Sequence, residues 1–148
     1  MASYAENRKA RFNYEILEKY ETGIELLGTE VKSVRGGQMS LEGAFVIVRG
    51  GEAFLINANI PPYQPKNAPK DYDPLKNRKL LLTKKELAEL AGSEKNKSLT
   101  IVPISVYNKG RKIKVEIALV KGKKKFDKRE TLKKRDTDRE IRREIKER

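Results

Sequence analysis

The sequence predicts a mainly β chain whose short antiparallel strands close into a small barrel. Apolar and polar residues alternate over residues 113–119, which is the pattern of a strand with one buried face. Two apolar runs, residues 44–49 and 52–60, meet at a Gly-Gly pair, which favours a hairpin turn. About six such strands, with two or three short helices, fit an OB-fold-like barrel.

The first half of the chain is expected to begin with a basic segment at residues 7–11. The apolar pattern then predicts strands over residues 14–21 and 24–27, paired across a Thr-Gly turn. Thr29 is expected to cap one or two helical turns. The glycine pair at residues 36–37 should end them, because glycine tolerates a left-handed backbone.

The second half is expected to hold a long loop, one solid helix and the last two strands. Residues 61–77 contain five prolines and few apolar residues, which predicts a loop. Residues 83–86 have the spacing of a capping box, and Gly92 is expected to end the helix that follows. Residues 99–107 should form the fifth strand, in which Pro103 requires an edge position or a bulge because proline has no N–H.

Positive charge is concentrated at the C-terminal end of this 148-residue chain, whose formal net charge is +13. Residues 121–148 carry 14 Lys/Arg, 7 Asp/Glu and one aromatic residue, whereas residues 1–120 carry 20 Lys/Arg and 14 Asp/Glu. We therefore expect a barrel over residues 1–120 and a basic tail over residues 121–148, disordered alone and helical when bound. A basic arm on a basic head favours nucleic acid, and above all RNA, as the partner. A solvated terminus without a partner is the simpler alternative.

Composition excludes several chemistries. The chain has no Cys, which rules out disulfides and thiolate metal sites, and no His, which rules out Ser–His–Asp and Cys–His catalysis. No segment approaches the ~18 apolar residues of a membrane span, and residues 1–6 do not resemble a secretory signal. We expect a cytoplasmic, monomeric protein that is not an enzyme, needs no cofactor or metal and does not bind a membrane.

Two other functions are compatible with the residues. Asp71 and Asp73 would hold magnesium in a carboxylate–metal nuclease, although a solvated loop is the favoured interpretation of this pair. The chain would also suit a ribosomal protein whose basic extension binds rRNA. Retention on ribosomes washed with high salt would distinguish that protein from a dissociable factor.

Three groups of cations are candidates for phosphate contact. Lys32 and Arg35 lie three residues apart on the predicted short helix, and the Arg-Lys pair at residues 78–79 precedes three leucines that are expected to be mostly core. The densest group lies in residues 121–129. There, Phe126 either stacks on an unpaired base or folds back on the barrel.

Five blocks of the sequence, in order, resemble the SsrA-binding protein family of bacteria. They are residues 7–11 (NRKAR), 28–35 (GTEVKSVR), 51–55 (GEAFL), 73–82 (DPLKNRKLLL) and 121–130 (KGKKKFDKRE). The resemblance implies an OB-fold barrel that binds the tRNA-like domain of transfer-messenger RNA and travels with this RNA and elongation factor Tu to stalled ribosomes. It also implies that the tail occupies the decoding centre of the 16S rRNA and the empty mRNA channel.

The resemblance further implies roles for individual residues. The RNA-facing residues are expected to be Asn7, Glu21, Lys32, Arg35, Arg78, Lys79 and Leu81, to which we add Arg8 and Arg11 of the basic N-terminal segment. The decoding-centre residues are expected to be Lys123, Lys124, Lys125, Phe126, Asp127, Lys128 and Arg129. This chain departs from many relatives at Asn108, where they have Trp, and beyond Arg135 it matches in character only.

Glu21 is informative because its carboxylate would repel phosphate. Such a residue suits an RNA interface only if it accepts hydrogen bonds from amino or imino groups of the bases, which is direct readout. We therefore expect Glu21 to recognise bases rather than to attract the RNA backbone.

Overall fold

The computed structural model describes residues 3–64, 66 and 70–122, and the chain is mainly β as predicted. The strands are β1 (Ser3–Glu6), β2 (Tyr14–Ile24), β3 (Phe45–Arg49), β4 (Glu52–Ile56), β5 (Arg78–Leu81), β6 (Leu99–Lys109) and β7 (Lys112–Gly122). The helices are α1 (Arg8–Asn13), α2 (Gly28–Arg35) and α3 (Lys84–Glu94). None of the helices in the described part has the length and apolar character needed to cross a membrane.

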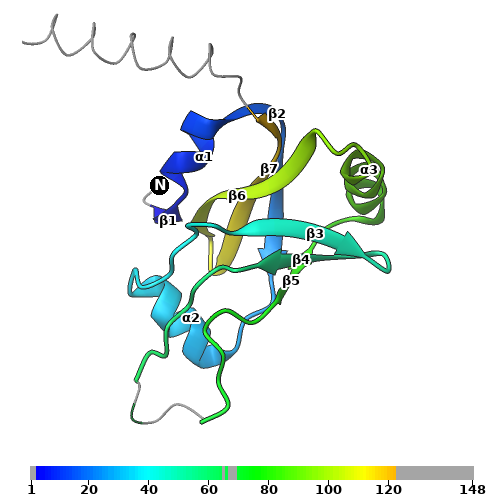
Figure 1. Cartoon of the computed structure of the whole chain (residues 1–148). Coiled ribbons are helices and arrows are strands. Elements are labelled where there is room, and N and C mark those ends of the chain that lie inside the picture. The colour runs from blue at the N-terminus through cyan, green and yellow to red at the C-terminus, as the bar shows by residue number, and fades with distance from the viewer. Residues whose placement is uncertain (1–2, 65, 67–69, 123–148) are drawn as a thin grey trace, which may run out of the picture.

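The strands pair in one antiparallel sheet that closes on itself (Figure 1). Their order is β1-β6-β3-β4-β5-β2-β7, and an additional pairing between β6 and β7 joins the two sides. β6, β3, β4, β5, β2 and β7 therefore form a ring, with β1 added beside β6. The expected barrel of about six strands is confirmed. Closure pairs strands that would otherwise present free edges.

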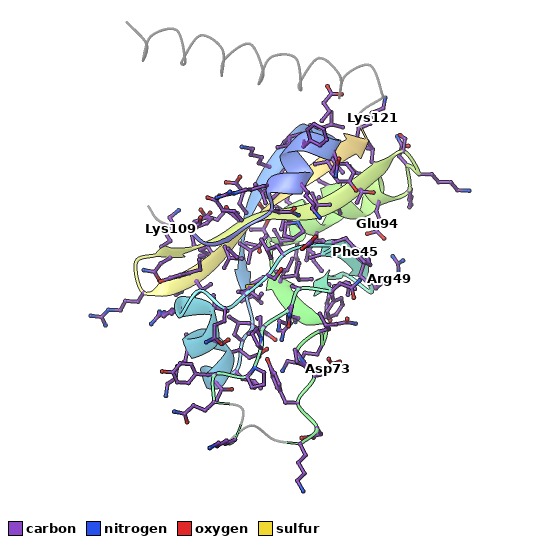
Figure 2. The ribbon with its side chains drawn as sticks, turned by 60° about the vertical axis from the view of Figure 1, so that its left-hand side comes forward. Phe45, Arg49, Asp73, Glu94, Lys109 and Lys121 are labelled. Atoms are coloured by element: carbon purple, nitrogen blue, oxygen red, sulfur yellow. The ribbon has the colours of Figure 1, made fainter. Side chains whose placement is uncertain are left out.

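β6 and β7 each span 11 residues and form a long hairpin (Figure 2). Their register runs from Leu99 opposite Lys121 to Lys109 opposite Lys112, with a shift just after Pro103. The predicted irregularity at Pro103 is confirmed, since proline offers no N–H to the ladder. Lys109 and Lys121 consequently lie at opposite ends of the hairpin.

β2 is continuous where the sequence predicts a turn. It does not reverse at the Thr-Gly pair, because Gly23 pairs with Lys114 of β7 on one side and with Leu81 of β5 on the other. The predicted strand over residues 24–27 is therefore wrong. A glycine suits this position, since a Cβ atom here would lie 3.2 Å from the Leu81 side chain.

In both longer helices, a glutamate of the first turn accepts a hydrogen bond from the backbone N–H of the residue before the helix. In α2 the carboxylate of Glu30 accepts the N–H of Leu27 at 2.8 Å, so the helix starts one residue before Thr29 and the predicted threonine cap is wrong. In α3 the predicted capping box at residues 83–86 is confirmed in both directions.

Three elements and one helix end were not expected from the sequence. The basic N-terminal segment forms α1, in which Oδ1 of the cap residue Asn7 accepts the N–H of Ala10 at 3.2 Å. β1 and β5 are additional strands whose partners are distant in sequence. α3 continues through Gly92 to Glu94, and Gly92 is not among the glycines with positive φ.

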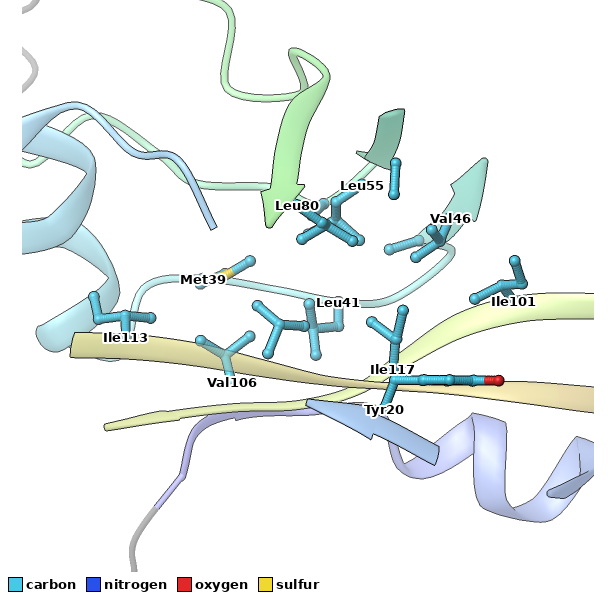
Figure 3. Packing of buried hydrophobic residues seen from close by; sticks show 14 of the residues in the cluster. Tyr20, Met39, Leu41, Val46, Leu55, Leu80, Ile101, Val106, Ile113 and Ile117 are labelled. Carbon is cyan, nitrogen blue, oxygen red and sulfur yellow. The ribbon is translucent and has the colours of Figure 1, made fainter. Parts of the chain in front are cut away.

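Aliphatic side chains from every strand of the ring fill the barrel (Figure 3). Members of this cluster are Tyr20, Met39, Leu41, Val46, Leu55, Leu80, Ile101, Val106, Ile113 and Ile117. A smaller cluster contains Ala10 of α1 with Val102, Ile104, Ala118 and Val120 of β6 and β7. α1 therefore covers one end of the outer face of the β6–β7 hairpin. Polar side chains occupy the other end.

Candidate nucleic-acid interface

A groove of about 360 Å³ lies where β2, β5 and β7 meet beside α2. Its apolar lining consists of Gly23, Ile24, Leu26, Val31, Leu81 and Ile113, and its cations are Arg35, Arg111, Lys112 and Lys114. An apolar floor accepts the face of an unstacked base, while surrounding cations neutralise phosphates. The groove thus offers both contacts that single-stranded RNA requires.

The groove brings together two residues expected to face RNA, Arg35 and Leu81. The Arg35 guanidinium donates to the carbonyl oxygen of Arg111 at 3.0 Å, which joins the end of α2 to the β6–β7 turn. Leu81 is 49% exposed although its neighbour Leu80 is buried. An exposed leucine beside four cations is an unusual surface and a suitable one for a base.

The Glu21 carboxylate lies on the outer face of the barrel close to this groove, and two residues of β6 hold it. Its Oε2 accepts the Tyr107 hydroxyl at 2.5 Å, and its Oε1 accepts the Lys109 ammonium at 2.9 Å. The Tyr107 hydroxyl, followed by Lys109, lowers the pKa of Glu21. The group therefore remains a hydrogen-bond acceptor in mildly acidic solution.

Arg78 is not at the surface. Its side chain is 1% exposed, and its Nε donates to Oε2 of Glu30, which is equally buried, at 2.7 Å. The remaining guanidinium nitrogens donate to the carbonyls of Ala58, Lys76 and Pro74 and to the Tyr72 hydroxyl. Every donor is used internally, so the expectation of an RNA-facing Arg78 is wrong. The residue anchors the end of the 61–77 loop against α2.

Glu30 is ionised inside this network. Burial on its own would raise the pKa of Glu30, but the N–H of Leu27 and the Arg78 guanidinium outweigh it and lower the pKa. The Lys76 ammonium, with its Nζ 3.3 Å from Oε1 of Glu30, is a third group that stabilises the ionised carboxylate. Lys79, one residue beyond Arg78, points the other way and forms a half-exposed ion pair with Glu52 at 3.1 Å.

The expected residues of the N-terminal segment lie away from the groove. Asn7 donates from Nδ2 to the carbonyl of Pro103 at 3.0 Å and caps α1, so its side chain helps to stabilise the fold. The Arg8 side chain is 92% exposed, with Glu6 no closer than 4.0 Å. The side chain of Arg11 lies outside the described part of the chain.

Lys32 is exposed on α2, with its ammonium 5.9 Å from the centre of the Tyr63 ring. Cation and ring together form a surface suited to a phosphate or a base. Tyr63 was not predicted as a site residue.

Sequence reasoning missed most of the cations around the groove and the two residues that hold Glu21. The missed residues are Tyr107, Lys109, Arg111, Lys112 and Lys114. The alternation over residues 112–118 did place two of the lysines on the outward face. No local signal joins Glu21 to Tyr107, because 86 residues separate them.

Asn108 and Asp73 of the long loop have local partners. Nδ2 of Asn108 donates to the carbonyl of Gly110 at 2.6 Å within the β6–β7 turn. Oδ1 of Asp73 accepts the N–H of Leu75 at 2.9 Å. Among the described residues no group of three or more Asp, Glu, His or Cys is arranged to hold a metal ion.

The predicted decoding-centre residues follow β7, whose last residue is Gly122. Lys123, Lys124, Lys125, Phe126, Asp127, Lys128 and Arg129 all lie outside the described residues.

The chain is similar to known proteins over almost its whole length. The model of the SmpB protein family matches residues 4–147. An SsrA-binding protein of Thermosynechococcus vestitus is 49% identical over 144 residues, which cover 97% of this chain and 95% of that protein. An SsrA-binding protein of Sulfurihydrogenibium is 54% identical over 142 residues, covering 96% and 93%.

One solved structure agrees in both fold and sequence. It is described as "tmRNA-SmpB: a journey to the center of the bacterial ribosome". The match has a TM-score of 0.68 and 45% sequence identity, and it covers 86% of this chain and 92% of that one.

Proposed function

This chain belongs to the SmpB protein family, and on that basis we propose that it is the RNA-binding adaptor of trans-translation. It binds the tRNA-like domain of transfer-messenger RNA and delivers it to stalled ribosomes, with elongation factor Tu attached through the RNA. The observation that carries the proposal is the family match over residues 4–147. Crosslinking in living cells, followed by sequencing of the attached RNA, tests it directly.

We propose that residues 1–120 bind the RNA. Residues 121–148 occupy the ribosomal decoding centre and the empty mRNA channel. The arrangement of β7 supports this division. The groove lies at the Lys112 end of β7, and Lys121 and Gly122, the first two residues of the proposed tail, form its other end. At about 3.3 Å per residue these two points are roughly 30 Å apart. The groove and the start of the tail therefore lie at opposite ends of this strand.

The residues proposed to contact RNA through the barrel are Glu21, Lys32, Arg35, Lys79 and Leu81, with Arg8, Arg11 and the capping residue Asn7 at the α1 side. Arg78 is proposed to support this surface from inside. The tail residues proposed to act in the decoding centre are Lys123, Lys124, Lys125, Phe126, Asp127, Lys128 and Arg129. We further propose a monomeric, cytoplasmic protein that performs no catalysis itself and needs no cofactor.

Replacement of Glu21 by alanine is expected to weaken binding of the tRNA-like RNA by about tenfold, because a charged acceptor for base N–H groups is lost. The fold should remain intact, since the carboxylate is exposed and its two partners lie at the surface. Gel-shift titration measures the affinity, and thermal unfolding checks the fold. Glu15→Ala, an exposed carboxylate at the far end of β2, is the matched control and should bind normally. Equal affinity of the Glu21 variant and the wild type would contradict the assignment.

Binding is expected to depend strongly on salt. With ~6 phosphate contacts, the logarithm of the association constant should fall with the logarithm of salt concentration at a slope of roughly −4 to −5. Titrations at several salt concentrations give the slope. Arg35→Met should reduce its magnitude by roughly one contact, whereas Glu21→Ala should leave it unchanged. A salt-independent affinity would argue against phosphate recognition by the groove.

A further inference from the structure

We propose that Tyr107 and Lys109 are positioning residues that hold the Glu21 carboxylate as a fixed acceptor for N–H groups of RNA bases. The inference rests on the proposed function and adds two residues of β6 to its site. Neither residue was predicted from the sequence. The direct hydrogen bonds from both to Glu21 carry the inference.

The geometry of these bonds is unusual because a strand separates the partners. Glu21 on β2 lies opposite Glu116 of β7, and Tyr107 on β6 lies opposite Lys114 of β7. Neighbouring strands are about 4.8 Å apart, so the two side chains must reach across β7 to meet. Only long side chains pointing toward each other can do this. The contact therefore fixes the direction of the Glu21 side chain along the outer face.

The two bonds use only part of the capacity of the carboxylate. Oε2 accepts one hydrogen bond and Oε1 accepts another, while each carboxylate oxygen has two acceptor positions. The Glu21 side chain is also 39% exposed, so a ligand can approach it. An unrestrained exposed glutamate would lose rotamer freedom on binding RNA. Here Tyr107 and Lys109 have already restricted that freedom, which favours binding.

The surrounding charges keep this acceptor ionised. The Tyr107 hydroxyl is the largest cause of the lowered pKa of Glu21, followed by Lys109, and Lys114 acts in the same direction. Burial acts in the opposite direction but is outweighed. Glu116, which lies opposite Glu21 on β7, is paired with Lys19 at 3.6 Å. In turn, burial and the bond to Glu21 raise the pKa of Tyr107, so its hydroxyl remains a donor at any physiological pH. Donor and acceptor roles are therefore fixed at both ends of the bond.

The test is a double-mutant cycle on the full-length chain with a transcript of the tRNA-like domain as the probe. Tyr107→Phe removes one hydroxyl and should weaken binding about three- to tenfold. In the Glu21→Gln background the same change should have no further effect, because there is no carboxylate to position. Tyr20→Phe is the matched control: its hydroxyl donates to Glu89 at 3.3 Å in another tyrosine–glutamate pair, and its RNA affinity should be unchanged.

The acid side of the binding profile separates positioning from a merely structural role. The lowered pKa keeps Glu21 charged as the pH falls, so loss of the hydroxyl should move the loss of affinity to higher pH. Carbon-13 NMR of the Glu21 carboxyl should show the same upward shift in the free protein. The Glu21→Gln variant, which has no carboxylate at this position, shows how much of the pH dependence of binding comes from groups other than Glu21.

Two results would overturn the inference. In the first, wild-type protein binds the RNA and Glu21→Gln weakens it, but Tyr107→Phe binds and titrates like the wild type. In the second, Tyr107→Phe weakens binding equally in the wild-type and Glu21→Gln backgrounds, which would mean that Tyr107 acts independently. Failure of the wild-type chain to bind the transcript would instead refute the proposed function itself.

Discussion

Removal of residues 123–148 is expected to abolish peptide tagging on stalled ribosomes while leaving binding of the tRNA-like RNA nearly unchanged. The described barrel ends at Gly122, and its groove, Glu21 and Lys32 all lie within the retained residues. The deleted residues supply 13 Lys/Arg and 7 Asp/Glu, so their loss should lower nonspecific affinity mainly at low salt. A reconstituted translation reaction on a message without a stop codon measures tagging, and gel-shift titration measures RNA binding.

A second variant distinguishes tail sequence from tail charge. A chain carrying the same 26 C-terminal residues in shuffled order keeps the composition of the tail but loses the order of Asp127, Lys128 and Arg129. This variant should bind RNA like the wild type and still fail to tag. Tagging by the truncated chain would refute any role of the tail. Tagging by the shuffled chain would show that positive charge alone is sufficient.

The parts of the fold that sequence reasoning predicted are those with a local cause. The alternation over residues 113–119 identified β7 because one face of that strand contacts the barrel interior, while Lys114 and Glu116 on the other face are half-exposed. The glycines at residues 50–51 marked the β3–β4 turn, and both adopt positive φ, at 59° and 74°. In each case a pattern of a few residues contains the whole physical reason.

The missed parts depend on partners far along the chain. β5 was overlooked because Arg78 occupies an inward position where an apolar residue would be expected. Its partner Glu30 is 48 residues away, and only the folded chain shows that the two charges neutralise each other in the interior. The same limit applies to the site. The sequence predicted Lys79 as a cation available for phosphate, but it did not predict that Arg78 is buried.

Replacement of Arg78 by methionine is expected to destabilise the barrel by about 3–5 kcal/mol, because it leaves the Glu30 carboxylate buried without its main counterion. Folded domains are typically stable by only about 5–15 kcal/mol, so the melting temperature should fall by roughly 10–20 °C. Calorimetry and urea unfolding measure the change. Lys9→Met is the matched control: it breaks the Lys9–Glu42 ion pair, whose side chains are 73% and 69% exposed, and should cost less than about 1 kcal/mol.

The acid dependence of stability identifies Glu30 as the responsible group. Its pKa is lowered in the folded protein, so ionised Glu30 stabilises the fold above its ordinary pKa, and this stability is lost as the pH falls through the lowered value. Glu30→Gln removes that titration, and its urea midpoint should therefore vary less in acid than that of the wild type. The double variant Glu30→Gln/Arg78→Met contains no buried unpaired charge, so it should be more stable than Arg78→Met alone. If adding Glu30→Gln instead lowers the stability of Arg78→Met further, hydrogen bonds to the loop carbonyls rather than charge neutralisation are the main contribution of Arg78.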